Sequence, residues 1–129
     1  MIDKLNTIVS SKYAAILWTG IIFILCSYPS ASLPKIHNDK TLHFVAFAGF
    51  SFFWTFHSSK SWLIILIAVL YGIGIEFWQA ILPKSFHRGF DWYDAFADSV
   101  GGVIGYIIWL VYRRLISIIL PKNPSETSL

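Results

Sequence analysis

Long apolar runs separated by short polar segments dominate the chain. Four runs stand out: residues 8–28, 41–56, 62–82 and 90–120. A helix needs about 20 apolar residues to cross a bilayer, and prolines, which do not continue a helix, follow the first, third and fourth runs. The pattern predicts an all-α integral membrane four-helix bundle. We expect a single domain over residues 1–129, with residues 122–129 as a disordered tail.

The first run also bears some likeness to a signal peptide, because Ser30-Ala31-Ser32 loosely mimics a peptidase site. Its apolar stretch is longer than the 7–15 residues typical of a signal-peptide core. We therefore interpret it as a retained membrane span.

Four crossings place both termini on the same side of the membrane. That side also holds the turn after the second run, and its basic residues are Lys4, Lys12, Lys60, Arg113, Arg114 and Lys122. The basic residues on the opposite side are Lys35, Lys40, Lys84 and Arg88. The larger number favours cytoplasmic termini under the positive-inside rule. The loops at residues 29–39 and 83–90 are then predicted to face outward.

Composition and charge exclude several other classes of protein. Apolar residues make up 56% of the chain and charged residues only 13%, about half the share typical of soluble domains. The net charge is +3, but the basic residues are scattered and form no patch for nucleic acid. A lone cysteine, Cys26, allows neither a disulfide framework nor a thiolate metal site. Phosphate-loop, dinucleotide-binding, zinc-protease and hydrolase-elbow motifs are absent from the sequence.

Polar residues in the predicted spans gather on one face of each helix. At 100° per residue, the fourth span carries three aspartates and three glycines on one stripe: Asp91, Asp94, Asp98, Gly101, Gly102 and Gly105. The opposite face suits lipid contact: Trp92, Phe96, Val100, Val103 and Ile107. Glu76 and Gln79 share a face of the third span, and Asp39 and His43 share one at the start of the second.

These polar faces lie at similar depth. Each polar face lies near the end of its helix that joins a predicted outer loop, so we expect one polar pocket in the outer half of the membrane. Its predicted residues are Asp39, Lys40, His43, Glu76, Gln79, Arg88, Asp91, Asp94 and Asp98. Intramembrane ionisable residues are commonly functional.

A structural interpretation stays open beside this one. Interhelical polar contacts stabilise membrane bundles by about 0.6–2 kcal/mol each, so the cluster can serve as packing contacts alone. Asp39 is equally suited to capping a helix, and Asp91 can pair with Arg88 three residues earlier. Gly101 and Gly105 allow another helix to approach closely.

Three motifs occur in order along the chain. They are Asp39-Lys40-x-x-His43-Phe44, Glu76-x-x-Gln79, and Arg88-x-x-Asp91-x-x-Asp94-x-x-x-Asp98-x-x-Gly101-x-x-x-Gly105. With them, residues 10–115 resemble the VanZ-like family of small bacterial membrane proteins, named for a member associated with teicoplanin resistance. Asp98 stands where the family pattern usually has Asn. The resemblance implies a multi-pass protein of the bacterial cytoplasmic membrane that affects the response to glycopeptide antibiotics.

The favoured functional interpretation is a non-catalytic binding or modulating protein of the cell envelope. Lys40 and Arg88 suit a phosphate headgroup, Arg bidentately, and the aromatic second span suits an acyl or isoprenoid chain. Expected partners are membrane lipids, including anionic or polyprenyl phosphate lipids, or a lipophilic glycopeptide; no nucleic acid is expected. This interpretation needs no cofactor and no metal.

Two alternatives belong to other classes. A metal-assisted hydrolase or transferase would use His43, Glu76, Asp94 and Asp98, which suit Mg²⁺ or Mn²⁺; whether the chain is an enzyme stays open, with binding favoured. An ion or proton pathway is least favoured, because the inner halves of the last three spans offer only Ser51, Thr55 and Tyr71.

Overall fold

The described part of the chain is entirely helical apart from its connections. The computed structural model describes residues 1–32 and 39–120. Its α-helices are α1 (Ile2–Val9), α2 (Lys12–Ser27), α3 (Asp39–Thr55), α4 (Ser61–Ile81) and α5 (Trp92–Ile119), and its 3-10 helices are η1 (Ser30–Ser32) and η2 (Lys84–Phe86). The predicted all-α class is confirmed for these residues. The tail predicted at residues 122–129 lies outside them.

The first predicted span, residues 8–28, corresponds mainly to α2, and the chain bends near the start of the predicted span. Helix α1 ends at Val9, and α2 begins at Lys12 at an angle of 57° to it. The Ser11 side chain accepts a hydrogen bond of 3.2 Å from the Tyr13 N–H and so caps a new helix. The apolar run contains no glycine or proline at this point, and the serine cap accounts for the break.

Two helices, α4 and α5, are long and apolar enough to cross a membrane, and α1 with α2 forms a third candidate if the bent pair is one span. Helix α3 has 17 residues, about 26 Å at 1.5 Å per residue, which is less than the hydrocarbon core of about 30 Å. On length and composition, the structure therefore supports two of the four expected crossings, or three if α1 and α2 form one bent span.

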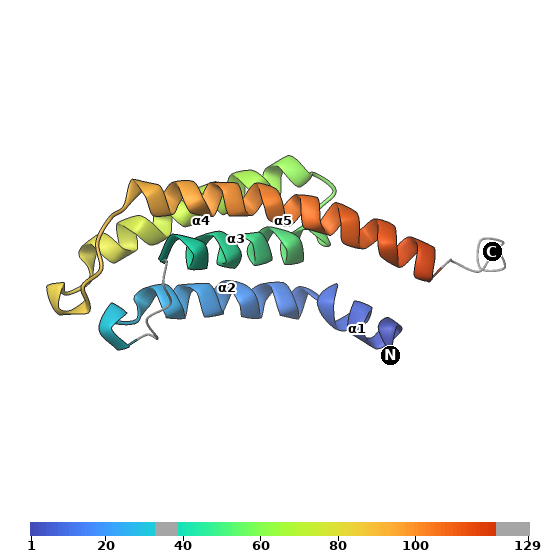
Figure 1. The fold of residues 1–129 in the computed structure, drawn as a ribbon, viewed down its shortest axis with the longest axis horizontal. Coiled ribbons are helices and arrows are strands. Elements are labelled where there is room, and N and C mark those ends of the chain that lie inside the picture. The colour runs from blue at the N-terminus through green and yellow to red at the C-terminus, as the bar shows by residue number, and fades with distance from the viewer. Residues whose placement is uncertain (33–38, 121–129) are drawn as a thin grey trace.

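Helix α3 lies between α2 and the pair formed by α4 and α5 (Figure 1). Its most extensive packing is against α5. The connections carrying η1 and η2 lie at one end of the molecule, while α1 and the C-terminal end of α5 lie at the other (Figure 1). At the connection end, the Ser30 hydroxyl donates a hydrogen bond of 3.3 Å to the His87 carbonyl. Residues 29–32, which are the described start of the first predicted outer loop, and residues 83–90 thus share one end of the molecule, as predicted (Figure 1).

Small residues set the distance between α3 and α5. A Cβ atom on Gly101 would overlap the backbone carbonyl of Phe44, and one on Gly105 would overlap that of Ala48. The two backbones are thus in contact along this face. The opposite face of α5 is exposed, including all five residues predicted to face lipid: Trp92, Phe96, Val100, Val103 and Ile107.

Aromatic side chains fill the core between α2, α3 and α4. Phe47 and Phe50 are buried and pack against Tyr71 with ring centroids 5.5 and 5.3 Å away. The Tyr71 hydroxyl donates to the Thr19 carbonyl at 3.0 Å, and the Trp54 indole N–H donates to the Thr19 hydroxyl at 2.9 Å. The polar groups of Tyr71 and Trp54 therefore both have a partner on α2, which fixes the rotation of α3 and α4 against it.

Candidate functional site

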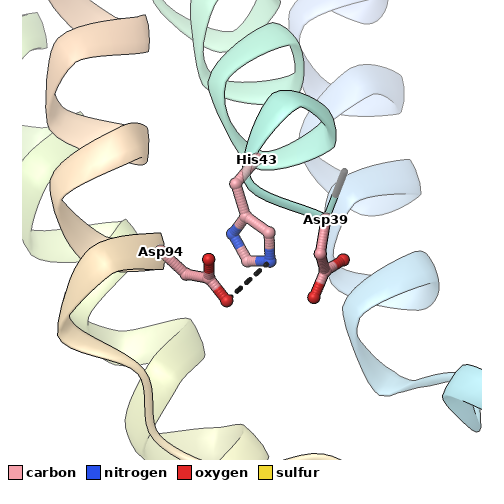
Figure 2. A group of neighbouring side chains, drawn as sticks. All are labelled: Asp39, His43 and Asp94. Atoms are coloured by element: carbon pink, nitrogen blue, oxygen red, sulfur yellow. Dashed lines mark ion pairs between the residues drawn. The ribbon is translucent and has the colours of Figure 1, made fainter. Parts of the chain in front are cut away.

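His43, in the first turns of α3, lies at the centre of the polar cluster. Its Nδ1 is 3.0 Å from Asp98 Oδ1 and 3.9 Å from Glu76 Oε1. Its Nε2 points the other way and lies 4.0 Å from Asp94 Oδ2, as Figure 2 shows. One imidazole therefore connects carboxylates from α4 and α5.

The inner residues of the cluster are buried. Glu76 and Asp98 are 0% exposed, and His43 is 5% exposed. Glu76 Oε2 accepts a hydrogen bond of 2.8 Å from the Asp91 N–H, but Glu76 Oε1 and Asp98 Oδ2 have no hydrogen-bond partner among the described residues. An unpaired buried polar atom costs about 1–3 kcal/mol, and more when charged. A cluster serving only as packing contacts would be expected to satisfy these atoms.

Lys40 forms the solvent-facing side of the cluster. Its Nζ lies 3.1 Å from Asp91 Oδ2 and 3.2 Å from Asp94 Oδ1, and its side chain is 46% exposed. Asp91 also caps α5, because its carboxylate accepts a hydrogen bond of 2.7 Å from the Tyr93 N–H. These two interactions, the Tyr93 N–H first and Lys40 second, lower the pKa of Asp91.

Arg88 binds carbonyl groups at the C-terminal end of α2. Its Nε donates to the Tyr28 carbonyl at 3.1 Å, and its Nη2 donates to the Leu25 carbonyl at 3.4 Å. Carbonyls in the last turn of a helix lack partners within it, so the guanidinium caps α2. Its Nη1 is 3.9 Å from Asp39 Oδ2. The Asp91–Arg88 pair suggested by sequence spacing does not form; Arg88 faces Asp39, and Asp91 faces Lys40.

Gln79 also binds α2 rather than the carboxylates. Its side-chain amide donates to the Cys26 carbonyl at 3.0 Å. Together with Arg88, it holds the last turn of α2 against the rest of the bundle. Eight of the nine predicted pocket residues thus form ion pairs or hydrogen bonds that centre on Lys40, His43 or Arg88. The ninth, Gln79, lies beside them.

A cavity of about 260 Å³ opens between α2 and α3 next to this cluster. Its wall is mostly apolar, and its ionisable residues are Asp39, His43 and Arg88. The other residues that line it are Trp18, Ile21, Ile22, Leu25, Cys26, Leu42, Val45, Ala46 and Phe47. The space is therefore amphipathic, with charged groups from the connection end of the bundle and an apolar wall along two helices.

Sequence reasoning missed the contribution of α2 to this cavity. Trp18 lines the cavity and donates an indole hydrogen bond of 2.8 Å to the Ala46 carbonyl. Gly49 makes room for the Trp18 ring, which a Cβ atom there would overlap. The two residues lie 31 positions apart, and nothing in the local pattern of either one signals the contact.

Two sets of three residues have the donor atoms for a metal ion. In each set, the potential ligand atoms lie within 4.8 Å of one another: His43, Glu76 and Asp98 in one, and Asp39, His43 and Asp94 in the other. The first set is completely buried, whereas Asp39 in the second is exposed. Figure 2 shows the second set, with Asp39 and Asp94 on either side of the imidazole.

Residues 9–113 match the VanZ/LLP1 family, whereas no curated protein and no solved structure matches the chain. The matched segment includes α2 to α4, most of α5 and every residue of the polar cluster. With two helices that can cross a membrane and a family match over most of its length, the chain is a membrane protein that belongs to the VanZ/LLP1 family.

Proposed function

We propose that this protein binds a lipophilic ligand with a polar headgroup in the outer half of the bacterial cytoplasmic membrane, and thereby changes the response to teicoplanin-type glycopeptides. The proposed role is non-catalytic. Candidate ligands are an anionic or polyprenyl phosphate lipid, or the antibiotic itself through its lipid tail.

The observation that carries this proposal is the amphipathic cavity between α2 and α3. Its apolar wall, which includes Ile21, Leu25 and Phe47, suits a hydrocarbon chain, and its ionisable end suits a headgroup. Small-molecule sites are typically concave and mostly apolar, with a few polar groups that orient the ligand. The polar end lies at the same end of the bundle as the predicted outer loops.

Lys40 and Arg88, the two cations expected to bind one headgroup, have different surroundings. Arg88 lines the cavity, and its two hydrogen bonds to carbonyls leave part of its five N–H donors free. Lys40 instead pairs with Asp91 and Asp94 and lies 5.7 Å from the centroid of the Tyr93 ring. We therefore assign the headgroup contact to Arg88, with Lys40 holding the carboxylates of α5.

The proposed orientation places both termini in the cytoplasm and residues 29–39 and 83–90 outside, with α3 completing a fourth crossing despite its 17 residues. The support is the excess of basic residues on the terminal side. Cysteine labelling in intact cells is expected to modify Cys substituted at Ser85 and to leave Cys substituted at Ser117 unmodified. Labelling of Ser117→Cys alone would reverse the orientation and move the polar cluster to the inner leaflet.

Filling the cavity is expected to remove the proposed activity. Val45 lines the cavity and is 52% exposed, so Val45→Trp can occupy the space without disturbing the buried core. Expression of the wild-type protein is expected to change susceptibility to glycopeptides with a lipid tail more than to those without one, and Val45→Trp is expected to remove that difference. Growth inhibition is measured together with the amount of protein in the membrane.

Val103→Trp is the matched control, because Val103 is 42% exposed on the outer face of α5 and away from the cavity. It is expected to keep full activity. An equal shift for both antibiotic types with wild-type protein would indicate a general cell-wall effect. Full activity in Val45→Trp would contradict binding in this cavity.

A further inference from the structure

The carboxylates of the polar cluster are not equally compensated. Asp91 and Asp94 pair with Lys40, and Asp39 faces Arg88. Glu76 and Asp98, both 0% exposed, have no lysine or arginine within 4.0 Å among residues 1–32 and 39–120; the basic group beside them is His43. Two buried carboxylates therefore share a single imidazole, and when both are ionised at least one negative charge lacks compensation.

We propose that His43, Glu76 and Asp98 bind one divalent metal ion. A neutral imidazole, two carboxylates and a divalent ion sum to zero charge, which removes the penalty of an unpaired buried charge. The ion would also provide a partner for Glu76 Oε1, which has no hydrogen-bond partner within the described residues. This inference goes beyond the proposed function, which requires no metal.

The distances fit a coordination shell. With metal–ligand bonds of about 2.1 Å, neighbouring ligand atoms in an octahedron lie about 3.0 Å apart and opposite ones about 4.2 Å apart. His43 Nδ1 is 3.0 Å from Asp98 Oδ1 and 3.9 Å from Glu76 Oε1. The three donor atoms lie within 4.8 Å of one another, which is close to the spacing of such a shell.

Asp94 completes this arrangement from the other side of the imidazole. It lies 4.0 Å from His43 Nε2, beyond hydrogen-bond distance, and its negative charge favours a proton on Nε2 when Nδ1 binds the metal in place of its 3.0 Å contact with Asp98 Oδ1. Metal-binding histidines commonly direct their second ring nitrogen at a carboxylate in this way. Lys40, paired with Asp94, balances the charge of that carboxylate, so Asp94 acts as a positioning residue rather than a ligand.

The surroundings of the three proposed ligands differ. Gly72 on α4 leaves space for the Asp98 carboxylate, because a Cβ atom there would lie 2.8 Å from Asp98 Oδ2. Of the three, His43 lines the amphipathic cavity, whereas Glu76 and Asp98 are fully buried. Two hard oxygen donors and one imidazole suit Mn²⁺.

The test titrates MnCl₂ into the purified full-length protein in detergent after chelator treatment. We expect one Mn²⁺ per chain, measured by the loss of the free-Mn²⁺ EPR signal, and a melting temperature that rises with Mn²⁺ concentration. Glu76→Gln and Asp98→Asn are expected to weaken Mn²⁺ binding by at least about tenfold and to remove the rise in melting temperature.

Asp3→Asn is the matched control. It removes one exposed carboxylate from α1, which lies at the opposite end of the molecule from the connections beside the polar cluster (Figure 1), so Mn²⁺ affinity is expected to stay within about twofold of wild type. In the metal-free protein, Asp98→Asn is expected to melt no lower than wild type, because it removes an uncompensated buried charge; this shows that the variant folds. Absence of Mn²⁺ binding by folded wild-type protein, or equal binding by the Asp98→Asn and Asp3→Asn variants, would overturn the proposal.

Discussion

Gly105→Ala is expected to destabilise the protein more than any other single-methyl addition in α5. The added Cβ atom would overlap the Ala48 carbonyl, which belongs to the backbone of α3 and cannot rotate away as a side chain can. The two helices must separate to admit it, and α3 packs more extensively on α5 than on any other helix. Overpacking of this kind costs about 3 kcal/mol, measured as a loss of unfolding free energy in detergent.

Gly74→Ala provides the control for this substitution. Gly74 lies inside α4, and nothing stands within 4 Å of the position its Cβ would take. Alanine there is expected to stabilise the helix by up to about 1 kcal/mol through its higher helix propensity. Equal stability of the Gly105→Ala and Gly74→Ala variants would contradict the close approach of α3 and α5 at Gly105.

Glu76→Gln and Asp94→Asn are each expected to abolish the effect of expression on glycopeptide susceptibility, with normal accumulation in the membrane. Glu76 joins α4 to the start of α5 through the Asp91 N–H and faces His43. Asp94 links Lys40 to the other side of the same imidazole. Both amides nearly preserve shape, so the main change is the loss of a carboxylate charge from the cluster.

Two further observations distinguish function from packing. Phe96→Leu, on the exposed face of α5, is expected to leave susceptibility unchanged. Membrane levels of every variant are compared by immunoblot. If Glu76→Gln and Asp94→Asn lose activity only because the protein disappears, the cluster serves helix packing, and the proposed functional role fails.

The sequence predicted the helices well where their boundaries have local causes. Helix α4 ends just before Pro83, and the Asp91 side chain caps α5, so both lie within two residues of their predicted bounds. The buried face of α5 follows the stripe that contains Asp94, Asp98 and the glycines, because a period of 3.6 residues is a local property of the chain. The break at Ser11 also has a local cause, but a serine within an apolar run is too common a feature to predict it.

The partners of the charged groups required the tertiary structure. Lys40 and Asp91 are 51 positions apart, and Arg88 reaches Tyr28 across 60 positions. Sequence spacing suggested instead that Arg88 pairs with Asp91, its neighbour on the chain. Which partner a charge meets depends on the rotation and distance of whole helices, and a single sequence contains no direct measure of either.

The sequence by itself determined that this is a helical membrane protein, which polar residues lie on which helix face, and through three ordered motifs the family to which it belongs. Apolar length and helical period set these properties within one segment at a time. Only the tertiary structure decided that α2 is capped by Arg88, that α2 and α3 enclose an amphipathic cavity, and that Glu76 and Asp98 meet at His43 without a lysine or arginine among the described residues. Those features arise from contacts between helices, where the glycines of α5 and the aromatic core fix how closely and at what rotation the segments pack.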